Sequence, residues 1–190
     1  MLILASTSRY RRELLGRLRL PFEVAAPGVD EAPATGETPL QRAQRLALAK
    51  ASAISARQPT ATVIGSDQVA VCKGEVLGKP GGIARCREQL LHLSGSFASF
   101  FTALAVVDAR TGASFQAVDT TTVYFRVLQP PEIERYIAAE QPLDCAGGFR
   151  AEALGITLFA RIVSEDPTAL IGLPLIALAA ALRQMGYALP

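Results

Sequence analysis

The sequence contains little histidine and cysteine, the residues that most often carry nucleophilic and zinc chemistry. Its 190 residues include a single histidine, His92, which stands among leucines in a segment with helical periodicity. A Ser-His-Asp triad would depend on this one residue, and a metal site with several histidine ligands is excluded. Since histidines in such apolar surroundings usually only pack, we expect His92 to be structural.

The three cysteines, Cys72, Cys86 and Cys145, are too few for a fully paired disulfide framework, and none lies in a C-x-x-C spacing. This pattern is typical of reduced thiols in the cytoplasm. Long apolar runs are also missing. The run 2–5 is too short for a signal peptide, and the run 170–182 contains a proline and is shorter than the roughly 20 residues that a membrane helix needs. We therefore expect a cytoplasmic protein with no membrane partner.

Charge of one sign does not dominate, because 19 Lys and Arg stand against 17 Asp and Glu, for a net charge of +2. Five arginines fall between residues 9 and 19, but no aromatic or groove-reading motif accompanies them, so no nucleic-acid partner is expected. The motifs G-x-x-x-x-G-K-[ST] and G-x-G-x-x-G are absent, since Gly78-Lys79 is followed by Pro80. P-loop and Rossmann sites are therefore excluded.

Helical and strand patterns alternate in the first half of the chain, and a long hairpin follows in the second half. Hydrophobic residues make up 50% of the sequence, enough for a substantial core, so we expect a single domain over residues 1–190. The patterns predict helices over 9–20, 39–57, 83–93, 131–140 and 174–185, and strands over 2–5, 22–26, 60–65, 69–71, 76–77, 96–107, 114–127 and 156–159. This order predicts an α/β fold with mixed α+β character and a mixed sheet.

Two cations fall on the apolar stripes of predicted helices. Arg11 shares its helix face with three leucines, and Lys50 shares its face with Leu46. Lys79 is a third candidate, held in a turn between glycine and proline. Each has an ordinary alternative, because an arginine can snorkel from the end of a stripe and a turn lysine is usually solvated.

Three cations directed inward need counter-charge, and the chain has neither a net acidic balance nor a cofactor motif to supply it. A polyanionic ligand such as a triphosphate is the simplest explanation. Ser6 and Ser8 add hydroxyls beside the N-terminus of the 9–20 helix, as in anion sites. Asp67 comes where the apolar strand ends, the place where ligand sites lie in α/β sheets, with a turn or cap role as the alternative.

Two further carboxylates are weaker candidates, since surface carboxylates are common. Glu31 lies in the loop 27–37, and Glu152 follows the glycine-rich segment 145–149. The glycines of that segment permit close backbone approach to a ligand, and a plain β-turn is an equally good interpretation.

Taken together, these segments resemble the Maf family of nucleotide pyrophosphatases. The motifs follow the family order along nearly the whole chain and read Leu4-Ala5-Ser6-Thr7-Ser8, Val29-Asp30-Glu31, Ile64-Gly65-Ser66-Asp67-Gln68, Gly78-Lys79-Pro80 and Cys145-Ala146-Gly147. The resemblance implies a Maf/ITPase-like fold, with a twisted sheet flanked by helices and two lobes around a nucleotide cleft. It also implies hydrolysis of a nucleoside triphosphate to a monophosphate and pyrophosphate, with a house-cleaning role in nucleotide metabolism.

The resemblance further assigns roles to individual residues. Asp67 matches the proton acceptor, and the positions that handle the substrate correspond to Ser6, Arg11, Glu31, Lys50 and Lys79. We expect Asp67 to act as general base toward a water that attacks the α-phosphorus, with Mg²⁺ or Mn²⁺ bridging phosphate oxygens to Asp67 and Glu31. The family also makes a homodimer plausible.

Three positions separate the 7-methyl-GTP enzymes of the family from the dTTP/UTP enzymes, and here they hold Tyr10, Gln68 and Glu152. The combination of an aromatic residue, Gln and Glu at these positions looks like that of the 7-methyl-GTP enzymes. Methylation at N7 makes guanine cationic, so the face of Tyr10 can attract it and Glu152 can accept its N–H groups. Two alternatives stay open: a pyrophosphatase for dTTP, UTP or CTP, and a nucleotide-binding regulator without catalysis.

Overall fold

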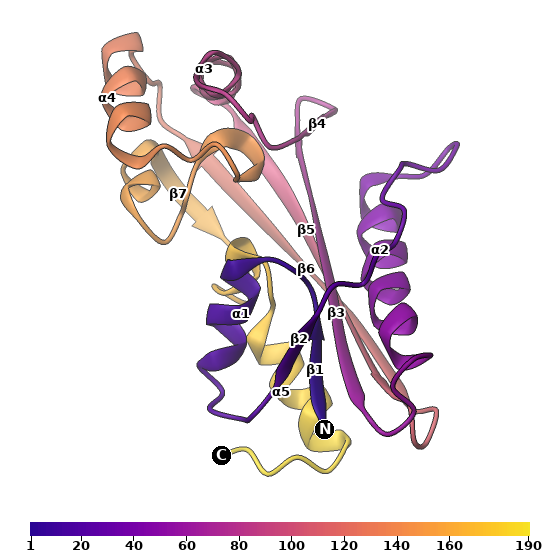
Figure 1. The fold of residues 1–190 in the computed structure, drawn as a ribbon. Helices are drawn as coiled ribbons and strands as arrows, with labels where there is room; N and C mark the ends of the chain where they lie inside the picture. The colour runs from indigo at the N-terminus through magenta and orange to yellow at the C-terminus, as the bar shows by residue number, and fades with distance from the viewer. The chain divides into compact units, whose positions relative to one another are not determined.

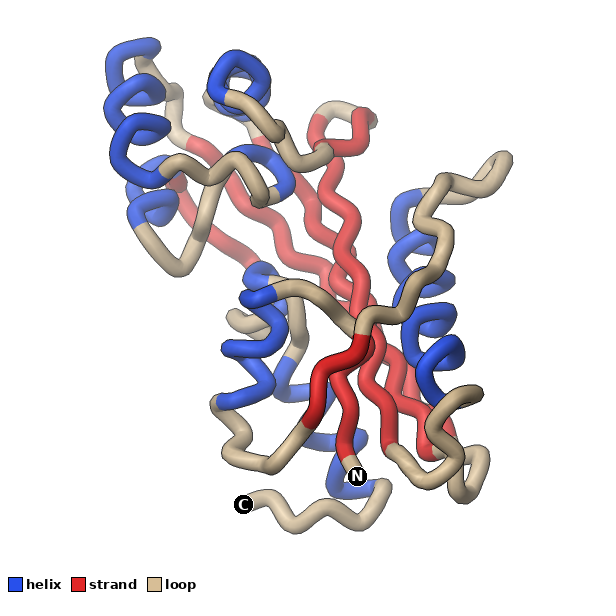
Figure 2. Tube along the Cα trace, viewed as in Figure 1, coloured by secondary structure: helices blue, strands red, loops and turns tan.

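The computed structural model describes residues 1–190 as a mixed sheet of seven strands accompanied by five α-helices (Figures 1 and 2). The strands are β1 (Leu2–Ala5), β2 (Glu23–Ala25), β3 (Thr62–Cys72), β4 (Glu75–Leu77), β5 (Phe97–Asp108), β6 (Ser114–Phe125) and β7 (Phe159–Val163). The helices are α1 (Arg9–Gly16), α2 (Pro39–Ser55), α3 (Ile83–Leu93), α4 (Pro130–Glu140) and α5 (Leu175–Gln184). The sheet order is β2-β1-β3-β5-β6-β7, with β4 paired to β3. The predicted mixed α/β class is confirmed.

The chain divides into two compact units. Unit 1 comprises Met1–Gln68, Phe101–Asp119 and Asp166–Pro190, and unit 2 comprises Val69–Phe100 and Thr120–Glu165. Strands β3, β5 and β6 each contribute residues to both units. No helix in either unit has the length and apolar character required to cross a bilayer.

Unit 1 is built on β1, which pairs in parallel with both β2 and β3. Ser8 caps the N-terminus of helix α1, and its side chain accepts a hydrogen bond from the Arg11 amide. The apolar core of this unit joins β1, α1 and α5 and includes Leu2, Leu4, Leu14, Leu15, Ile64, Leu104, Leu173, Leu178 and Leu182. Burial of these side chains orients α1 and fixes the segment that precedes α5.

Helix α2 begins with a capping box, in which Thr38 and Gln41 satisfy each other's backbone amides. Its backbone lies directly against β3 at Gly65. A Cβ atom built on Gly65 would stand 2.1 Å from the Ala47 carbonyl oxygen and 2.7 Å from the Ala51 nitrogen. Only glycine permits this approach, which brings Lys50 of α2 and Asp67 of β3 within reach of each other.

Unit 2 has an aromatic core in which Phe149 packs edge-on against three other phenylalanines. The ring centroids lie 5.2 to 5.6 Å from those of Phe100, Phe125 and Phe159. Helices α3 and α4 contact each other. The segments predicted as strands over 69–71 and 76–77 form a hairpin, because β3 and β4 pair antiparallel from Ala70–Leu77 to Cys72–Glu75.

Three predicted boundaries are wrong. Helix α1 ends at Gly16, not near Leu20, because the amides of the next three residues bond to carbonyls only three residues back. Residues 154–158 form a 3-10 turn, and the last strand, β7, begins only at Phe159, where pairing with β6 starts. The strand expected to end near Gly65 continues to Cys72, so Asp67 lies within β3.

Substitution of Gly65 by alanine should destabilise the protein, because the added methyl group meets the backbone of α2. We expect a loss of at least about 2 kcal/mol in the free energy of unfolding and a melting temperature lower by about 5 °C or more. Gly16→Ala is the matched control: nothing lies within 4 Å of its Cβ, so it should be neutral or slightly stabilising. Equal melting temperatures for the two variants would contradict the close approach at Gly65.

Candidate active site

Lys50 is a buried lysine whose ammonium group is held by two carboxylates. Its Nζ lies 2.6 Å from Asp67 Oδ1 and 2.6 Å from Glu31 Oε1. The side chains of Lys50 and Asp67 are 6% and 10% exposed, whereas Glu31 is 58% exposed. The expectation that the chain lacks counter-charge is therefore wrong for Lys50, since the burial of this cation is compensated within unit 1.

Arg11 lies close to this cluster and is anchored by a backbone carbonyl. Its Nε donates a 2.8 Å hydrogen bond to Gly172 O, which also accepts a 3.0 Å bond from Ser66 Oγ. Burial lowers the pKa of the Arg11 guanidinium, and the negative charges of Asp67 and Glu31 oppose that shift. Unit 1 thus brings together two cations and two carboxylates from four separate parts of the chain.

The start of α1 supplies two more of the predicted residues. Ser6 is buried, and its hydroxyl accepts a hydrogen bond from the Ser8 amide at 3.1 Å. Tyr10 is half-buried, and the guanidinium of Arg9 lies over its ring with Cζ 4.7 Å from the centroid. The Tyr10 ring therefore already accepts a cation on its face.

Gln68 follows Asp67 along β3, and its side chain turns to the opposite side of the strand. Its Nε2 donates to Thr102 Oγ1 at 2.9 Å, to Ala169 O at 3.0 Å and to Leu170 O at 3.1 Å. Thr102 in turn donates to Ala169 O at 3.0 Å. The Gln68 amide is thus held by the segment just before α5.

Lys79 belongs to unit 2 and is exposed, so the expectation of a third cation directed inward is wrong. Its turn is nevertheless well ordered by hydrogen bonds. Gly78 O accepts from Gln89 Nε2 at 3.0 Å and from the Gly147 amide at 3.3 Å. Two motifs that are far apart in the sequence, the Gly78–Pro80 turn and the glycine-rich segment, are neighbours in unit 2.

The glycine-rich segment forms a 3-10 turn over Ala146–Gly148. Gly148 has φ +70°, and a Cβ atom there would stand 2.8 Å from Cys86 Sγ, so both conformation and packing require glycine. Glu152, which follows this segment, is exposed and pairs with Arg150 at 3.6 Å. Arg150 also pairs with Glu140 at 2.8 Å, so Glu152 shares its cation with a second carboxylate.

Unit 1 offers a metal ion two carboxylates, Asp67 and Glu31, and no full set of coordinating side chains. No group of three or more His, Cys, Asp or Glu side chains is placed to hold a metal in the structure. The Asp67 and Glu31 oxygens do converge on one cation, the ammonium group of Lys50, at 2.6 Å each. This donor set fits a hard divalent cation that takes its remaining ligands from water and substrate oxygens.

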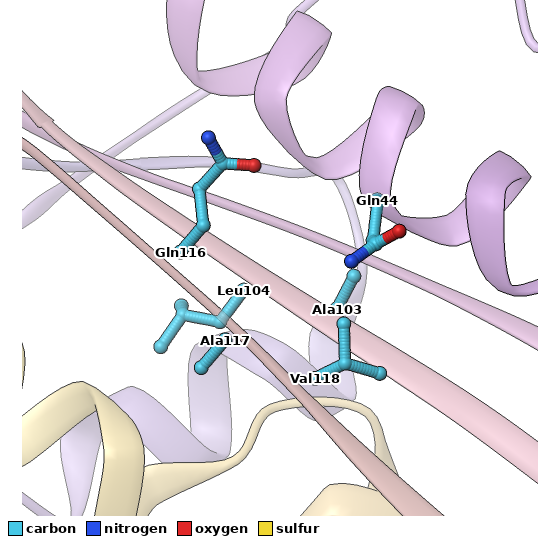
Figure 3. Close-up of a pocket in the computed structure, with 6 residues that line it drawn as sticks. All are labelled: Gln44, Ala103, Leu104, Gln116, Ala117 and Val118. Atoms are coloured by element: carbon cyan, nitrogen blue, oxygen red, sulfur yellow. The ribbon is translucent and has the colours of Figure 1, made fainter.

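A pocket of about 260 Å³ lies elsewhere in unit 1, and Figure 3 shows the side chains around it. It is lined by Gln44, Ala103, Leu104, Gln116, Ala117 and Val118. None of these side chains is charged and none belongs to the predicted site, so this pocket does not suit a polyanion.

Sequence patterns missed the backbone groups that organise the site. The carbonyls of Ala169, Leu170 and Gly172 accept hydrogen bonds from side chains more than 65 residues away. A carbonyl is present at every position, so no residue type signals this role. Thr102 was missed for a different reason: a threonine within a β-rich run looks like an ordinary strand residue.

The loop that carries Glu31 is held by two arginines of α2 that the sequence did not single out. Arg42 donates to Glu31 O at 2.9 Å, and Arg45 donates to Ala32 O at 3.0 Å. Arg45 also forms a two-point bond with the Glu37 carboxylate, at 2.6 and 2.8 Å. The Arg45 bond is the main cause that lowers the pKa of Glu37 from 4.5 to about 2.

Acid should loosen this loop. Because the folded-state pKa of Glu37 is depressed, its stabilising contribution is complete above pH 4.5 and is lost as the pH falls through about 2. We expect the protection of the amides over residues 30–37 against hydrogen exchange, relative to an unstructured peptide at the same pH, to fall across this acid range. Glu37→Gln should lower this protection already at neutral pH and remove its acid dependence; a variant that kept the wild-type profile of protection would exclude Glu37 as its source.

Comparison with known proteins shows the family of the chain. The family model described as Maf-like protein matches residues 1–185. A 7-methyl-GTP pyrophosphatase from Xanthomonas campestris pv. campestris (strain 8004) is 58% identical over 189 residues, which cover 100% of this chain and 98% of the relative. Relatives of the same name from Aromatoleum aromaticum and Bordetella pertussis are each 54% identical; they cover 100% and 97% of this chain, and 97% and 92% of their own lengths.

Among solved structures, the Staphylococcus aureus Ham1 protein matches with a TM-score of 0.46 and 17% identity, over 65% of this chain and 71% of its own. The family evidence comes instead from the full-length sequence matches, which confirm the resemblance drawn from the motifs. The chain belongs to the Maf-like protein family.

Proposed function

We propose that this protein hydrolyses 7-methyl-GTP to 7-methyl-GMP and pyrophosphate. The observation that carries the proposal is the identity of 54 to 58%, over nearly the full length of both chains, to relatives named 7-methyl-GTP pyrophosphatase. The cluster of two cations and two carboxylates in unit 1 supports it, because a triphosphate needs cations to bind and its hydrolysis needs a proton acceptor.

In the proposed mechanism, Asp67 accepts a proton from a water molecule as that water attacks the α-phosphorus. The new bond joins the water oxygen to this phosphorus, the bond to the bridging oxygen breaks, and pyrophosphate leaves. Arg11 and Lys50 would hold the phosphates by charge-assisted hydrogen bonds. Asp67 suits the role of base because its carboxylate is buried within a strand, so its position is well defined.

Asp67 and Glu31 would hold a divalent cation, Mg²⁺ or Mn²⁺, together with substrate oxygens. Such an ion would neutralise charge that develops on the departing pyrophosphate. Lys50 has a single ammonium group, which already contacts both carboxylates and would also have to bind the substrate phosphates.

Base selectivity is assigned to Tyr10, Gln68 and Glu152. The ring of Tyr10 already attracts the guanidinium of Arg9, which supports its ability to attract a cationic methylated base. Glu152 would accept N–H groups of guanine, with Arg150 as its present partner.

The direct test is pyrophosphate release by the purified protein, with Mg²⁺ or Mn²⁺, from 7-methyl-GTP beside GTP, UTP, dTTP and CTP at equal concentrations. We expect a clear preference for 7-methyl-GTP. A preference for pyrimidine nucleotides would keep the proposed chemistry and overturn the proposed selectivity. Nucleotide binding with no release from any substrate would indicate a regulator instead.

Asp67→Asn should reduce turnover by about a thousandfold or more, since a general base usually contributes 10²- to 10⁴-fold. Nucleotide affinity, measured by calorimetry, should change little because the amide keeps the size of the carboxylate. The matched control is Glu88→Gln, an exposed carboxylate on α3, which should retain full turnover. Near-normal turnover by Asp67→Asn would remove Asp67 from the role of base.

Tyr10→Leu should raise the KM for 7-methyl-GTP by about tenfold and change the KM for GTP far less, because the lost attraction acts on the cationic base. Tyr10→Phe keeps the aromatic face and should stay close to the wild type. Steady-state kinetics with both nucleotides checks this, and a KM increase that is equal for the two would mean that Tyr10 does not sense the charge of the base.

A further inference from the structure

The orientation of the Gln68 side-chain amide is fully determined by its surroundings. Ala169 O and Leu170 O are carbonyl oxygens that can only accept hydrogen bonds, and they lie 3.0 and 3.1 Å from Nε2. The single proton of the Thr102 hydroxyl is donated to Ala169 O, so this hydroxyl must accept from Gln68 at 2.9 Å. All three neighbours of Nε2 are therefore acceptors.

Rotation of the amide by 180° would be unfavourable. It would place Oε1 about 3 Å from the two carbonyl oxygens, with no proton between them and either carbonyl. Thr102 is completely buried, so no water can take over its bond to the amide without a rearrangement of β5.

The amide oxygen of Gln68 is left without a partner. Every hydrogen bond of this side chain runs through Nε2, and no donor within the structure reaches Oε1. The buried side-chain atoms that lack a hydrogen bond do not include Oε1, and Gln68 is only half-buried, so this oxygen is open to solvent. Gln68 thus presents an acceptor and no donor.

We propose that Thr102 is a positioning residue for selectivity: with the carbonyls of Ala169 and Leu170 it locks Gln68 so that Oε1 faces the substrate and accepts an N–H group of the base. This inference rests on the proposed function, because it assigns Gln68 to the base. Guanine carries a ring N–H and an amino group on one edge, whereas adenine and cytosine carry an unprotonated ring nitrogen there, which a fixed acceptor repels.

The kinetic test uses Thr102→Val, in which a methyl group replaces the hydroxyl. A methyl group cannot lie 2.9 Å from a nitrogen, so the amide has to shift and lose its fixed orientation. We expect the KM for 7-methyl-GTP to rise by about tenfold, kcat to stay within about twofold, and the preference over ATP and CTP to shrink. Thr102→Ser retains the hydroxyl and should restore wild-type values.

A double-mutant cycle with Gln68→Leu separates positioning from a general loss of packing. If Thr102 acts only through the amide, Thr102→Val should cost nothing further in kcat/KM once Gln68 is leucine. Independent effects of the two substitutions, or an unchanged KM and base preference in Thr102→Val, would overturn the inference.

A measurement without nucleotide distinguishes this inference from the proposed function. The Gln68 side-chain NH₂ protons should exchange slowly with water in NMR spectra of the labelled wild-type protein and faster in Thr102→Val. Rapid exchange in the wild type would overturn the fixed orientation, even if 7-methyl-GTP is hydrolysed. Slow exchange in a protein that hydrolyses no nucleotide would keep the orientation of Gln68, overturn the proposed function and, with it, the role assigned to Thr102 in base selection.

Discussion

The burial of one ammonium group constrains the architecture of unit 1. Lys50 is charged and almost inaccessible to water, and such a burial costs several kcal/mol unless the charge is compensated. Compensation comes from Asp67 on β3 and Glu31 on the loop before α2. The strand, the helix and the loop therefore have to meet at one point, and Gly65 permits the close approach of helix and strand.

The two sides of β3 serve different purposes because side chains alternate along a strand. Asp67 faces Lys50 of α2, while Ser66 and Gln68 turn to the segment before α5 and donate to its carbonyl oxygens. Gly172 O accepts from Ser66 and also from Arg11. One short stretch of backbone, residues 169–172, thereby orients side chains from α1, β3 and β5.

Periodicity and capping were enough to predict most elements, since the apolar stripe and the capping box of α2 are local properties of the chain. The burial of Lys50 followed from the same periodicity. The partners of Lys50 did not, because Glu31 and Asp67 stand 19 and 17 residues away and nothing in their neighbourhoods specifies a contact. The extension of β3 through Asp67 was also hidden, since strand pairing with later segments decides where it ends.

The position of Asp67 within a strand has a consequence for the proposed reaction. Asp67 Oδ1 accepts a hydrogen bond from Lys50. In the proposed reaction a triphosphate would compete with Asp67 and Glu31 for the same ammonium group, and it carries more negative charge than the two carboxylates together. Because β3 holds Asp67 in place while the lysine side chain has four rotatable bonds, Lys50 would be the group to move. Release of Asp67 Oδ1 would then accompany the arrival of the phosphates, so that binding and activation would be linked through one residue.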